Sequence, residues 1–367
     1  MPVDASEVAL LRLAAQRLAG PREEDAASAV RWLLAAQAQD LRGALVSTSL
    51  RTAGTDLSGP RAALDDGSVV RSWPMRGTLH LVPAEDLGWL LALTTERVLR
   101  GVASRRAALG VDEALVERAR EVVVEALRNG RSLPRDAVLA LWEEAGLLAS
   151  GERRVPQRGY HLLWTISQTG STCWGPLVGG GSDEQALVLL QEWVPAPRRL
   201  EREEALGELA RRYLASHGPA STADLARWCG LTTRDVRTGV ALARPDLEAV
   251  EVDGVEHLMD PGTPERLAAC RDDARRTMLL PGFDEMVLGY ADRSATVPAE
   301  HAGRVVPGGN GMFLGTVVTG GRAVATWKRT GRRTGPAVVA APFEAAPAGL
   351  PPAVADDVVR LGAALPS

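Results

Sequence analysis

The 367-residue sequence has few of the residues on which disulfide-linked, zinc-binding and membrane-spanning proteins depend. Its three cysteines, Cys173, Cys229 and Cys270, are far apart and show no Cys-x-x-Cys spacing, which argues against a disulfide framework and a zinc site. No run of about 18 apolar residues occurs, so no transmembrane helix is expected. The start of the chain, MPVDASEVALLRLAAQRL, is acidic and amphipathic rather than typical of a signal peptide. The composition therefore predicts a reduced, cytoplasmic protein that does not bind a membrane.

The sequence also lacks the motifs of the common hydrolases. Its histidines are His80, His161, His217, His257 and His301. None of them lies in an HExxH motif, an HxH motif or a nucleophile elbow. The glycine runs at Gly179–Gly181 and Gly308–Gly309 lack the Lys-Ser/Thr or the helix that a phosphate-binding loop requires. Catalytic triads and nucleotide hydrolysis therefore have no support, and we expect no metal ion and no cofactor.

Lysine is almost absent, since Lys328 is the only one, and the net charge of -4 excludes a general polycation. Any contact with nucleic acid must therefore come from arginines gathered on one face. The candidate DNA-contacting residues are Arg71, Arg76, His80, Arg154, Arg158, Lys328, Arg329, Arg332 and Arg333. A single cluster is more simply explained as solvated charge, but several clusters beside turns and hairpins favour phosphate contact. For His80, which alternates with Leu79 and Leu81, a surface or groove-facing position is favoured over catalysis.

Three helical segments followed by two short β runs occur near the start of the chain. Within residues 1–100, helices are predicted at Asp4–Leu18, from Pro21–Asp25 toward Gln37, and at Gly59–Asp66, with strands at Val69–Trp73 and Thr78–Val82. This is the order of elements in a winged helix.

The same order recurs twice. Within residues 101–195, helices are predicted at Asp112–Asn129, Leu133–Ala145 and Gln157–Gln168, with strands at Cys173–Val178 and Gln185–Leu190. Within residues 196–275, helices are predicted at Arg202–His217, Ala223–Cys229 and Arg234–Leu242, with strands at Glu248–Val252 and Val255–Met259. The third copy is the clearest, because Ser221 is a good helix cap, Gly230 a turn and Asp253-Gly254 a hairpin signal.

Residues 276–367 change to a β pattern. Strands are predicted in MLLPGFDEMVLGY (278–290), at Met312–Val318, Ala323–Trp327 and Val338–Phe343, with a helix at Ala353–Ala364. This region is expected to form a small β-barrel or sheet. The predicted fold class is α+β, with three tandem winged helix-turn-helix units followed by a C-terminal β-barrel.

Two glutamines stand at the end of an apolar helix pattern, in WLLAAQAQDLRG at Trp32–Gly43. Residues two apart point away from each other on a helix but share a face in extended chain. Gln37 and Gln39 can therefore converge only if the helix ends or bends there, and Asp40 and Gly43 favour such an ending. The simpler explanation is a polar helix end whose amides bond to backbone.

A catalytic role for two amides requires a reaction without a strong acid or base. Cleavage of the glycosidic bond of an N7-alkylated purine is such a reaction, because the leaving base already carries a positive charge. The protein then needs only to orient a water and to stabilise an oxocarbenium-like sugar. A glutamine carbonyl can orient the water, while its amide N–H can bond to the substrate.

Four stretches of the chain carry a family resemblance. They are QAQD at Gln37–Asp40, RSWPMRGTLHLVPAEDLGWLL at Arg71–Leu91, LLPGFDEMVLGYADRS at Leu279–Ser294 and NGMFLGTVVTGGRAVATWKR at Asn310–Arg329. The sequence resembles the winged-helix DNA glycosylases of the AlkZ type, which unhook interstrand crosslinks and remove N7-alkylpurines. The two-glutamine form resembles the crosslink-repairing, self-resistance branch, whereas the related branch has Asp at the position of Gln39.

The resemblance implies three tandem winged helices and a C-terminal β-barrel that form a concave DNA-binding surface. It implies a monofunctional, metal-free glycosylase in which Gln37 and Gln39 are the catalytic pair. Its partner would be double-stranded DNA with N7-alkylguanine adducts or crosslinks, made by natural alkylators such as the azinomycins. A hairpin that probes the duplex would lie at Val306–Phe313 or Thr319–Arg322. The protein is expected to act as a monomer at the nucleoid.

A crosslinked base is tethered to the opposite strand, so full flipping into a deep pocket would pull the partner base out as well. We therefore expect an open cleft at the glutamines. The alternative function is a non-enzymatic winged-helix transcriptional regulator. Such regulators usually dimerise on palindromic half-sites, whereas this chain contains three predicted units and no evident dimerisation helix.

Overall fold

The computed structural model describes residues 3–54, 56–149, 157–179, 183–330, 337–344 and 350–364. The chain divides into two compact units: unit 1 comprises Met1–Pro60 and Leu206–Ser367, and unit 2 comprises Arg61–Ala205. Unit 2 is thus an insertion in the sequence of unit 1. The four consecutive segments predicted from the sequence divide the chain differently, because 1–100 and 196–275 each cross a boundary between the units; they remain a prediction. Within the described ranges, no helix is both long and apolar enough to cross a membrane.

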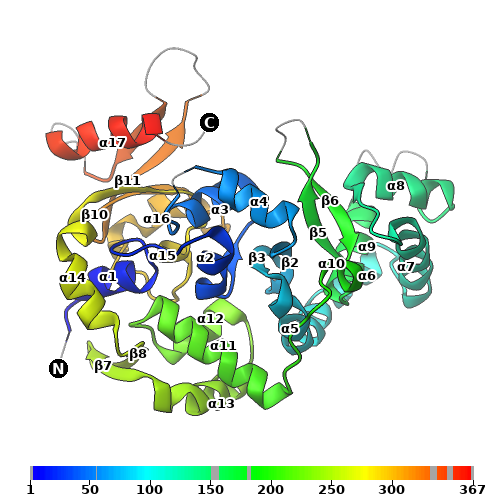
Figure 1. The fold of residues 1–367 in the computed structure, drawn as a ribbon, viewed down its shortest axis with the longest axis horizontal. Helices are drawn as coiled ribbons and strands as arrows, with labels where there is room; N and C mark the ends of the chain where they lie inside the picture. Colours follow the sequence, from blue (N-terminus) through cyan, green and yellow to red (C-terminus); the bar gives the residue numbers. More distant parts are fainter. Residues whose placement is uncertain are drawn as a thin grey trace. The chain divides into compact units, whose positions relative to one another are not determined.

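Unit 2 is built on a mixed set of helices and an antiparallel sheet. Its elements, with α4 leading into it, are α4 (Ser58–Asp65), β2 (Val69–Met75), β3 (Thr78–Pro83), α5 (Leu87–Gly101), α6 (Ala103–Ala108), α7 (Glu113–Leu127), β4 (Leu133–Pro134), α8 (Arg135–Glu144), α9 (Gln157–Gln168), β5 (Thr172–Leu177), β6 (Gln185–Leu189) and α10 (Leu190–Trp193). The strands run in the order β3-β2-β5-β6-β4, so the two predicted hairpins join into one sheet. Helices α7, α8 and α9 lie together beside β5 and β6 (Figure 1) and enclose Trp73, Trp142 and Leu163.

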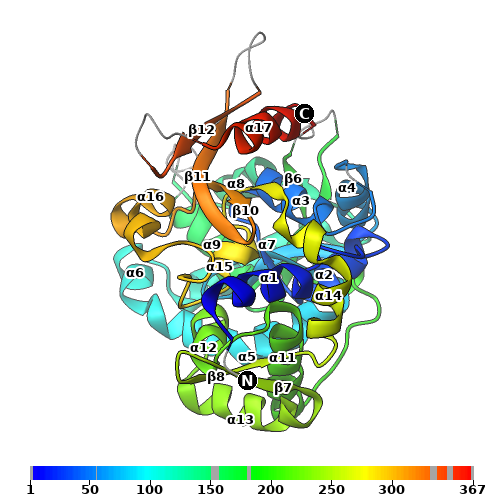
Figure 2. The ribbon, with the colours of Figure 1, turned by 90° about the vertical axis from the view of Figure 1, so that its left-hand side faces the viewer.

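Unit 1 begins and ends the chain. Its first part contains α1 (Ala5–Ala15), α2 (Ala26–Leu33), β1 (Ala36–Gln37) and α3 (Leu41–Ser49). After unit 2 follow α11 (Arg202–His217), α12 (Thr222–Cys229), α13 (Thr233–Ala243), β7 (Glu248–Val252), β8 (Val255–Met259) and α14 (Thr263–Arg275). The N-terminal and C-terminal parts of unit 1 pack against each other, since α1 and α14 lie side by side (Figure 2).

The helix-turn-helix string predicted at residues 221–242 is confirmed in detail. Ser221 and Asp224 form a reciprocal capping box at the start of α12, and Gly230 ends that helix with a φ of 71°. Thr232 then caps α13 by accepting a hydrogen bond from the Asp235 N–H. Glycine adopts a left-handed conformation without the steric cost of a side chain, so Gly230 allows the sharp turn between the two helices.

The C-terminal part of unit 1 does not form the closed β-barrel that was expected. It contains β9 (Thr277–Leu280), α15 (Glu285–Leu288), α16 (Ala302–Val305), β10 (Gly315–Thr319), β11 (Arg322–Arg329), β12 (Val338–Pro342) and α17 (Pro352–Ala364). Among the described residues, the strands form an open antiparallel sheet in the order β12-β11-β10-β9. The expected strand at residues 278–290 stops at Leu280, because Phe283 has a φ of 64° and Asp284 caps the short helix α15. Four strands are then too few to close, since small barrels use about eight.

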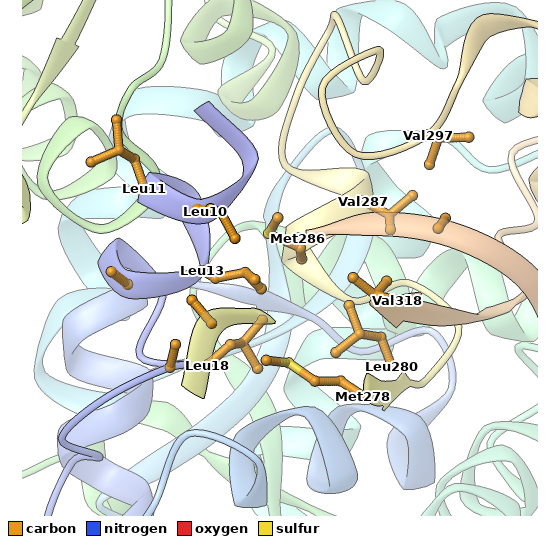
Figure 3. Packing of buried hydrophobic residues seen from close by; sticks show 14 of the residues in the cluster. Leu10, Leu11, Leu13, Leu18, Met278, Leu280, Met286, Val287, Val297 and Val318 are labelled. Carbon is orange, nitrogen blue, oxygen red and sulfur yellow. The ribbon is translucent and has the colours of Figure 1, made fainter. Parts of the chain in front are cut away.

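The core of unit 1 joins both ends of the chain. In Figure 3, Leu10, Leu13 and Leu18 from the N-terminal helix region meet Leu280 of β9 and Met286 of α15. A second, smaller cluster lies where α17 covers the sheet, with Val354 and Val358 against Val317 and Ala325. Burying these side chains stabilises unit 1 by roughly 1.5–3 kcal/mol for each fully buried Leu, Ile, Val or Met. Unit 1 therefore has no complete core until the C-terminal residues are present.

Three of the longer helices were not predicted, α3, α5 and α14, and neither were the short helices α6, α10, α15 and α16. Helix α3 has the sequence LRGALVSTS and is buried on nearly all sides. A helix buried all round shows no alternation of polar and apolar faces, so its period is invisible in the sequence. The strand predicted from Met312 begins instead at Gly315.

Candidate functional site in unit 1

The two glutamines lie between helices rather than inside one. Helix α2 ends at Leu33, because Leu34 adopts a φ of 68°, which is incompatible with a right-handed helix. Ala36–Gln37 is extended, and α3 begins only at Leu41. The prediction that the helix must end here is confirmed, although it ends four residues before Gln37. Gln37 is 7% exposed and Gln39 is exposed, so one amide lies within the protein and the other at its surface.

The backbone of Gln37 is held by a buried carboxylate. The Gln37 N–H donates to Glu285 Oε1 at 2.9 Å, and Trp228 Nε1–H donates to Glu285 Oε2 at 2.9 Å. His217 Nε2 lies 3.4 Å from the same Oε2 atom. Glu285 is only 1% exposed, so this charge depends on its donors for stabilisation. Gln37 is thereby fixed to residues of α11, α12 and α15.

The residue before Glu285 forms a second buried charge pair. Arg51 donates from Nη1 and Nη2 to the two oxygens of Asp284, each at 2.9 Å, and Ser47 Oγ donates to Oδ2 at 2.6 Å. Both partners of the pair are almost fully buried. Burial alone would raise the pKa of Asp284, but the charge of Arg51 and the hydrogen bonds from Arg51, Ser47 and the Met286 N–H outweigh it and lower that pKa. Because Ser47 and Arg51 lie at the end of α3 and just beyond it, this pair fixes the helix that follows the glutamines.

A chain of hydrogen bonds continues from Arg51 into the core. Arg51 Nη2 donates to Gln16 Oε1 at 2.7 Å, and Gln16 Nε2 donates to the Tyr290 hydroxyl at 2.9 Å. The Tyr290 hydroxyl in turn donates to the backbone oxygen of His217 at 2.8 Å. Burial raises the pKa of Tyr290, so its hydroxyl stays protonated and remains a donor. The network thus links α1, the end of α3, α11 and the segment after α15.

The carboxylate of Asp40 lies against Gly43, and any larger residue at position 43 would require the Asp40 side chain to move. An added Cβ on Gly43 would lie 2.8 Å from Asp40 Oδ2 and 3.4 Å from the Gly282 oxygen. Asp40 therefore folds back over the first turn of α3. Asp40 and Gln39 are exposed at this point, whereas Gln37 is not.

Of the basic residues predicted to bind DNA, only the C-terminal group belongs to unit 1. Lys328 and Arg329 lie exposed at the end of β11, while Arg332 and Arg333 lie outside the described residues. Partial burial, and then the nearby charge of Arg42, lower the pKa of Arg329. Arg42 is the second residue of α3, so the structure brings a strand-end arginine close to the helix that follows the glutamines.

The remaining predicted basic residues lie in unit 2. Arg71 donates to Gln185 Oε1 at 3.2 Å and lines a cavity of about 450 Å³ with Trp73 and Trp174. Arg158 donates to the Gly110 oxygen at 3.3 Å, and Arg154 lies outside the described residues.

Arg76 and His80, also in unit 2, lie close together at the hairpin turn. Arg76 has a φ of 54° and its Nη2 lies 3.3 Å from His80 Nε2. His80 is fully buried with Nδ1 2.8 Å from the Thr78 oxygen, so its expected surface position is wrong. The alternation of His80 with leucines could not show this, because both faces of its strand are buried.

The two candidate DNA-probing segments differ in their surroundings. The turn Thr319–Arg322 is a two-residue hairpin loop at Gly320-Gly321, but an added Cβ on Gly321 would lie 2.7 Å from Ala9 Cβ. This turn is therefore packed on α1. The other candidate, Val306–Phe313, is not a hairpin but a short 3-10 turn followed by irregular chain, most of it exposed.

The supporting residues Arg51, Trp228, Asp284 and Glu285 were not identified from the sequence. A signal was present, since Asp284-Glu285 is an acidic pair surrounded by apolar residues. Among the described residues, no group of three or more His, Cys, Asp or Glu side chains is placed to hold a metal ion. A metal-free reaction remains a prediction.

Comparisons with known proteins bear on this site. The family model described as DNA glycosylase AlkZ-like matches residues 30–364. The interstrand DNA cross-link repair glycosylase of Streptomyces sahachiroi is 28% identical over 314 residues, which are 84% of this chain and 83% of that protein. The solved structure of Streptomyces sahachiroi DNA glycosylase AlkZ is similar with a TM-score of 0.79 and 26% identity, covering 100% of this chain and 98% of that one.

The buried Arg51–Asp284 pair predicts a pH-dependent stability. Asp284→Asn leaves Arg51 without its countercharge and should lower the free energy of unfolding at pH 7 by about 3–5 kcal/mol. Because the folded pKa of Asp284 is lowered, the contribution of this carboxylate is present above its unfolded pKa of about 3.9 and is lost as the pH falls through the folded value. Urea unfolding from pH 7 to pH 3 should show the difference between wild type and variant shrinking below about pH 4. Asp356→Asn, at an exposed position, is the control and should change little. A constant difference at all pH values would contradict this account.

The second prediction concerns Glu285. In Glu285→Gln only one side-chain oxygen remains, so either the Gln37 N–H or the Trp228 N–H loses its acceptor, at a cost of about 1–3 kcal/mol. Hydrogen exchange at the Gln37 amide should become faster, and urea unfolding should show the loss of stability. Glu300→Gln, at an exposed position, serves as the matched control. Unchanged protection of the Gln37 amide would show that Glu285 does not hold this segment.

Proposed function

Because the chain belongs to the AlkZ-like DNA glycosylase family, we propose that it hydrolyses the N-glycosidic bond of N7-alkylated purines in DNA and unhooks interstrand crosslinks that contain them. The observation that carries the proposal is the placement of Gln37 and Gln39 outside any helix, with the Gln37 backbone bonded to buried Glu285. Crosslink repair is what the Streptomyces sahachiroi relative is named for. Self-resistance to an azinomycin-like alkylator follows from the same resemblance.

The proposed reaction matches the chemistry of two amides. The bond between C1′ and N9 breaks, and its electron pair moves into the base and neutralises the charge introduced by alkylation at N7. A water adds to C1′ and releases its proton to solvent, which leaves an abasic site. Gln37 and Gln39 orient this water and stabilise the sugar cation through their carbonyl oxygens. No leaving-group acid, metal ion or cofactor takes part.

The substrate is double-stranded DNA, bound by a monomer in the cytoplasm at the nucleoid. The proposed winged-helix units are residues 1–100, 101–195 and 196–275. The third is supported by the order of its elements, in which α11, α12 and α13 are followed by the β7–β8 hairpin. We assign phosphate contacts to the exposed residues Lys328 and Arg329 and to the neighbouring Arg332 and Arg333. Arg71, Arg76, Arg154 and Arg158 are assigned the same role in unit 2. The exposed segment Val306–Phe313 is the better candidate for probing the duplex, because the turn at Thr319–Arg322 is packed on α1.

The proposal predicts base release that depends on the glutamines. Incubation with an oligonucleotide duplex containing N7-methylguanine, followed by alkaline cleavage, should show strand breaks at the modified base. Gln37→Ala and Gln39→Ala should each lower the single-turnover rate by about a hundredfold or more, the cost of losing one group that stabilises developing charge. Gln191→Ala, an exposed glutamine of α10, is the matched control and should react like wild type. A transcriptional regulator would bind DNA but release no base, and that result, or full activity in Gln37→Ala, would overturn the proposal.

The same mechanism predicts discrimination by charge of the base. N7-methylguanine and an N7-linked guanine crosslink should be substrates, whereas hypoxanthine, a neutral purine, should not be released at a measurable rate. The reason is that a neutral base needs a proton donor as it leaves, and two amides near neutral pH do not supply one. Comparable release of hypoxanthine would show that an acid acts in the site.

A further inference from the structure

A cavity of about 560 Å³ lies in unit 1 beside the segment that follows α15. Residues from α12, from the chain after α15, from α16 and from the Pro307–Phe313 loop line it, among them Arg227, Asp292, Arg293, Val297, Val305 and Phe313. The two glutamines are not among its lining residues. We call it the arginine cavity, because Arg227 and Arg293 both line it.

Neither arginine is neutralised within the part of the chain that the structure describes. Arg293 donates from Nε to the Val287 oxygen at 3.0 Å, and its guanidinium carbon lies 5.0 Å from the centroid of the Phe313 ring. Its Nη2 atom is buried without a hydrogen-bond partner, and no carboxylate lies within 4.0 Å of either guanidinium among the described residues. Burial, and then the nearby charge of Arg227, lower the pKa of Arg293. Two cations close together in a cavity favour an anion between them.

The nearest carboxylates are already engaged elsewhere. Asp292 accepts the Ser294 N–H at 2.9 Å, in a turn of its own. Asp224 accepts the N–H groups of Ala291 at 2.8 Å and Asp292 at 3.2 Å, besides its capping bonds with Ser221. Both carboxylates raise the pKa of Arg293, but not enough to offset burial and Arg227. Neither carboxylate pairs with Arg227 or Arg293, so the two guanidinium groups can bind an anionic ligand.

The other residues that line the cavity indicate what else the ligand contains besides an anionic group. Val297, Val305 and Phe313 present apolar surface, and the cavity is several times larger than a phosphate group. Its volume is within the range of about 300–1,000 Å³ that small-molecule sites occupy. Met312 and Leu314, on either side of Phe313, are 55% and 41% exposed. A ligand with one anionic group and one flat apolar group fits these walls.

We propose that the arginine cavity binds one nucleotide of the DNA substrate, with its phosphate at Arg227 and Arg293 and its base against Val297, Val305 and Phe313. The proposal rests on the proposed function, because that function makes DNA the ligand. Glu285, which accepts the Gln37 N–H, and Arg293 are eight residues apart on one segment. The glutamine site and the arginine cavity are therefore both built on this segment. A nucleotide held here near the lesion would be drawn out of the base stack, which opens the duplex without flipping the tethered base. A free nucleoside monophosphate offers the same chemistry.

The phosphate contact is tested by Arg227→Gln, which removes an exposed charge without touching the core. The probe is a duplex with a tetrahydrofuran abasic analogue, which the enzyme cannot cleave. The dissociation constant should rise about tenfold, as expected for one charged hydrogen bond. The slope of log affinity against log salt should fall by about one. Arg118→Gln, an exposed arginine of α7, is the matched control and should keep the wild-type slope.

The base contact is tested by filling the cavity. Gly303 lines it, is exposed, and an added Cβ would meet no atom within 4 Å, so Gly303→Trp should fold normally. With 2-aminopurine placed in turn at each position beside the analogue, wild type should raise the fluorescence at one position, as the base leaves the stack. Gly303→Trp should abolish that rise, whereas Gly303→Ala should keep it. Free dGMP is then added as a competitor. If it displaces no DNA and wild type still shows the rise in 2-aminopurine fluorescence, the ligand of the cavity is a nucleotide of DNA.

The outcomes separate this proposal from the proposed function. Unchanged affinity, salt slope and fluorescence in Arg227→Gln and Gly303→Trp would overturn the nucleotide site, even if base release depends on Gln37. Binding of dGMP with no fluorescence change in any duplex would also overturn it and assign the cavity to a free nucleotide. Failure of wild type to release N7-methylguanine would overturn the glycosylase instead, while the binding measurements on the uncleavable duplex would remain interpretable.

Discussion

Asp284 and Glu285 are adjacent carboxylates with 1% exposure each, and two neighbouring negative charges can be buried only if each has its own donors. Asp284 is bound by Arg51, Ser47 and the Met286 N–H, whereas Glu285 is bound by the Gln37 N–H and Trp228. The two sets of donors come from elements far apart in the sequence. The positions of the glutamine segment and of the end of α3 therefore depend on the burial of these two carboxylates.

This arrangement explains how the glutamines can be held outside a helix. Gln37 is buried and its main chain is fixed by Glu285, whereas Gln39 reaches the surface two residues later. The short stretch between α2 and α3 is held by Glu285 at Gln37, and the helix that follows it is held at its far end by the Asp284–Arg51 pair. The proposed reaction, in which the site orients a water and a sugar cation, would depend on such fixed geometry more than on a shifted pKa.

Much of the fold could be predicted from local pattern. The α9, α11 and β7–β8 elements begin and end where the sequence predicts, because each shows a clear period, a cap or an Asp-Gly turn. Helix α3 was not predicted because it is buried on nearly all sides. The prediction of a closed barrel was wrong because the segment from Pro281 to Asp284 ends strand β9 early. The glutamine pair could be identified from its chemistry and from family resemblance. The residues that support the glutamines could not be predicted, since Glu285 is 248 residues from Gln37 in the sequence and no local signal links the two.

The insertion of unit 2 within unit 1 has a consequence for synthesis of the chain. Ribosomes deliver residues at roughly 5–20 per second, and domains fold as their last residues emerge. Arg61–Ala205 is complete first, while α1, α2 and the glutamines still lack the partners at residues 278–343 that form their core. Gln37 cannot be fixed before Glu285 has been made. A nascent or truncated chain thus has a folded middle and no ordered glutamine pair, so the capacity to cut a glycosidic bond would arise only near the end of translation.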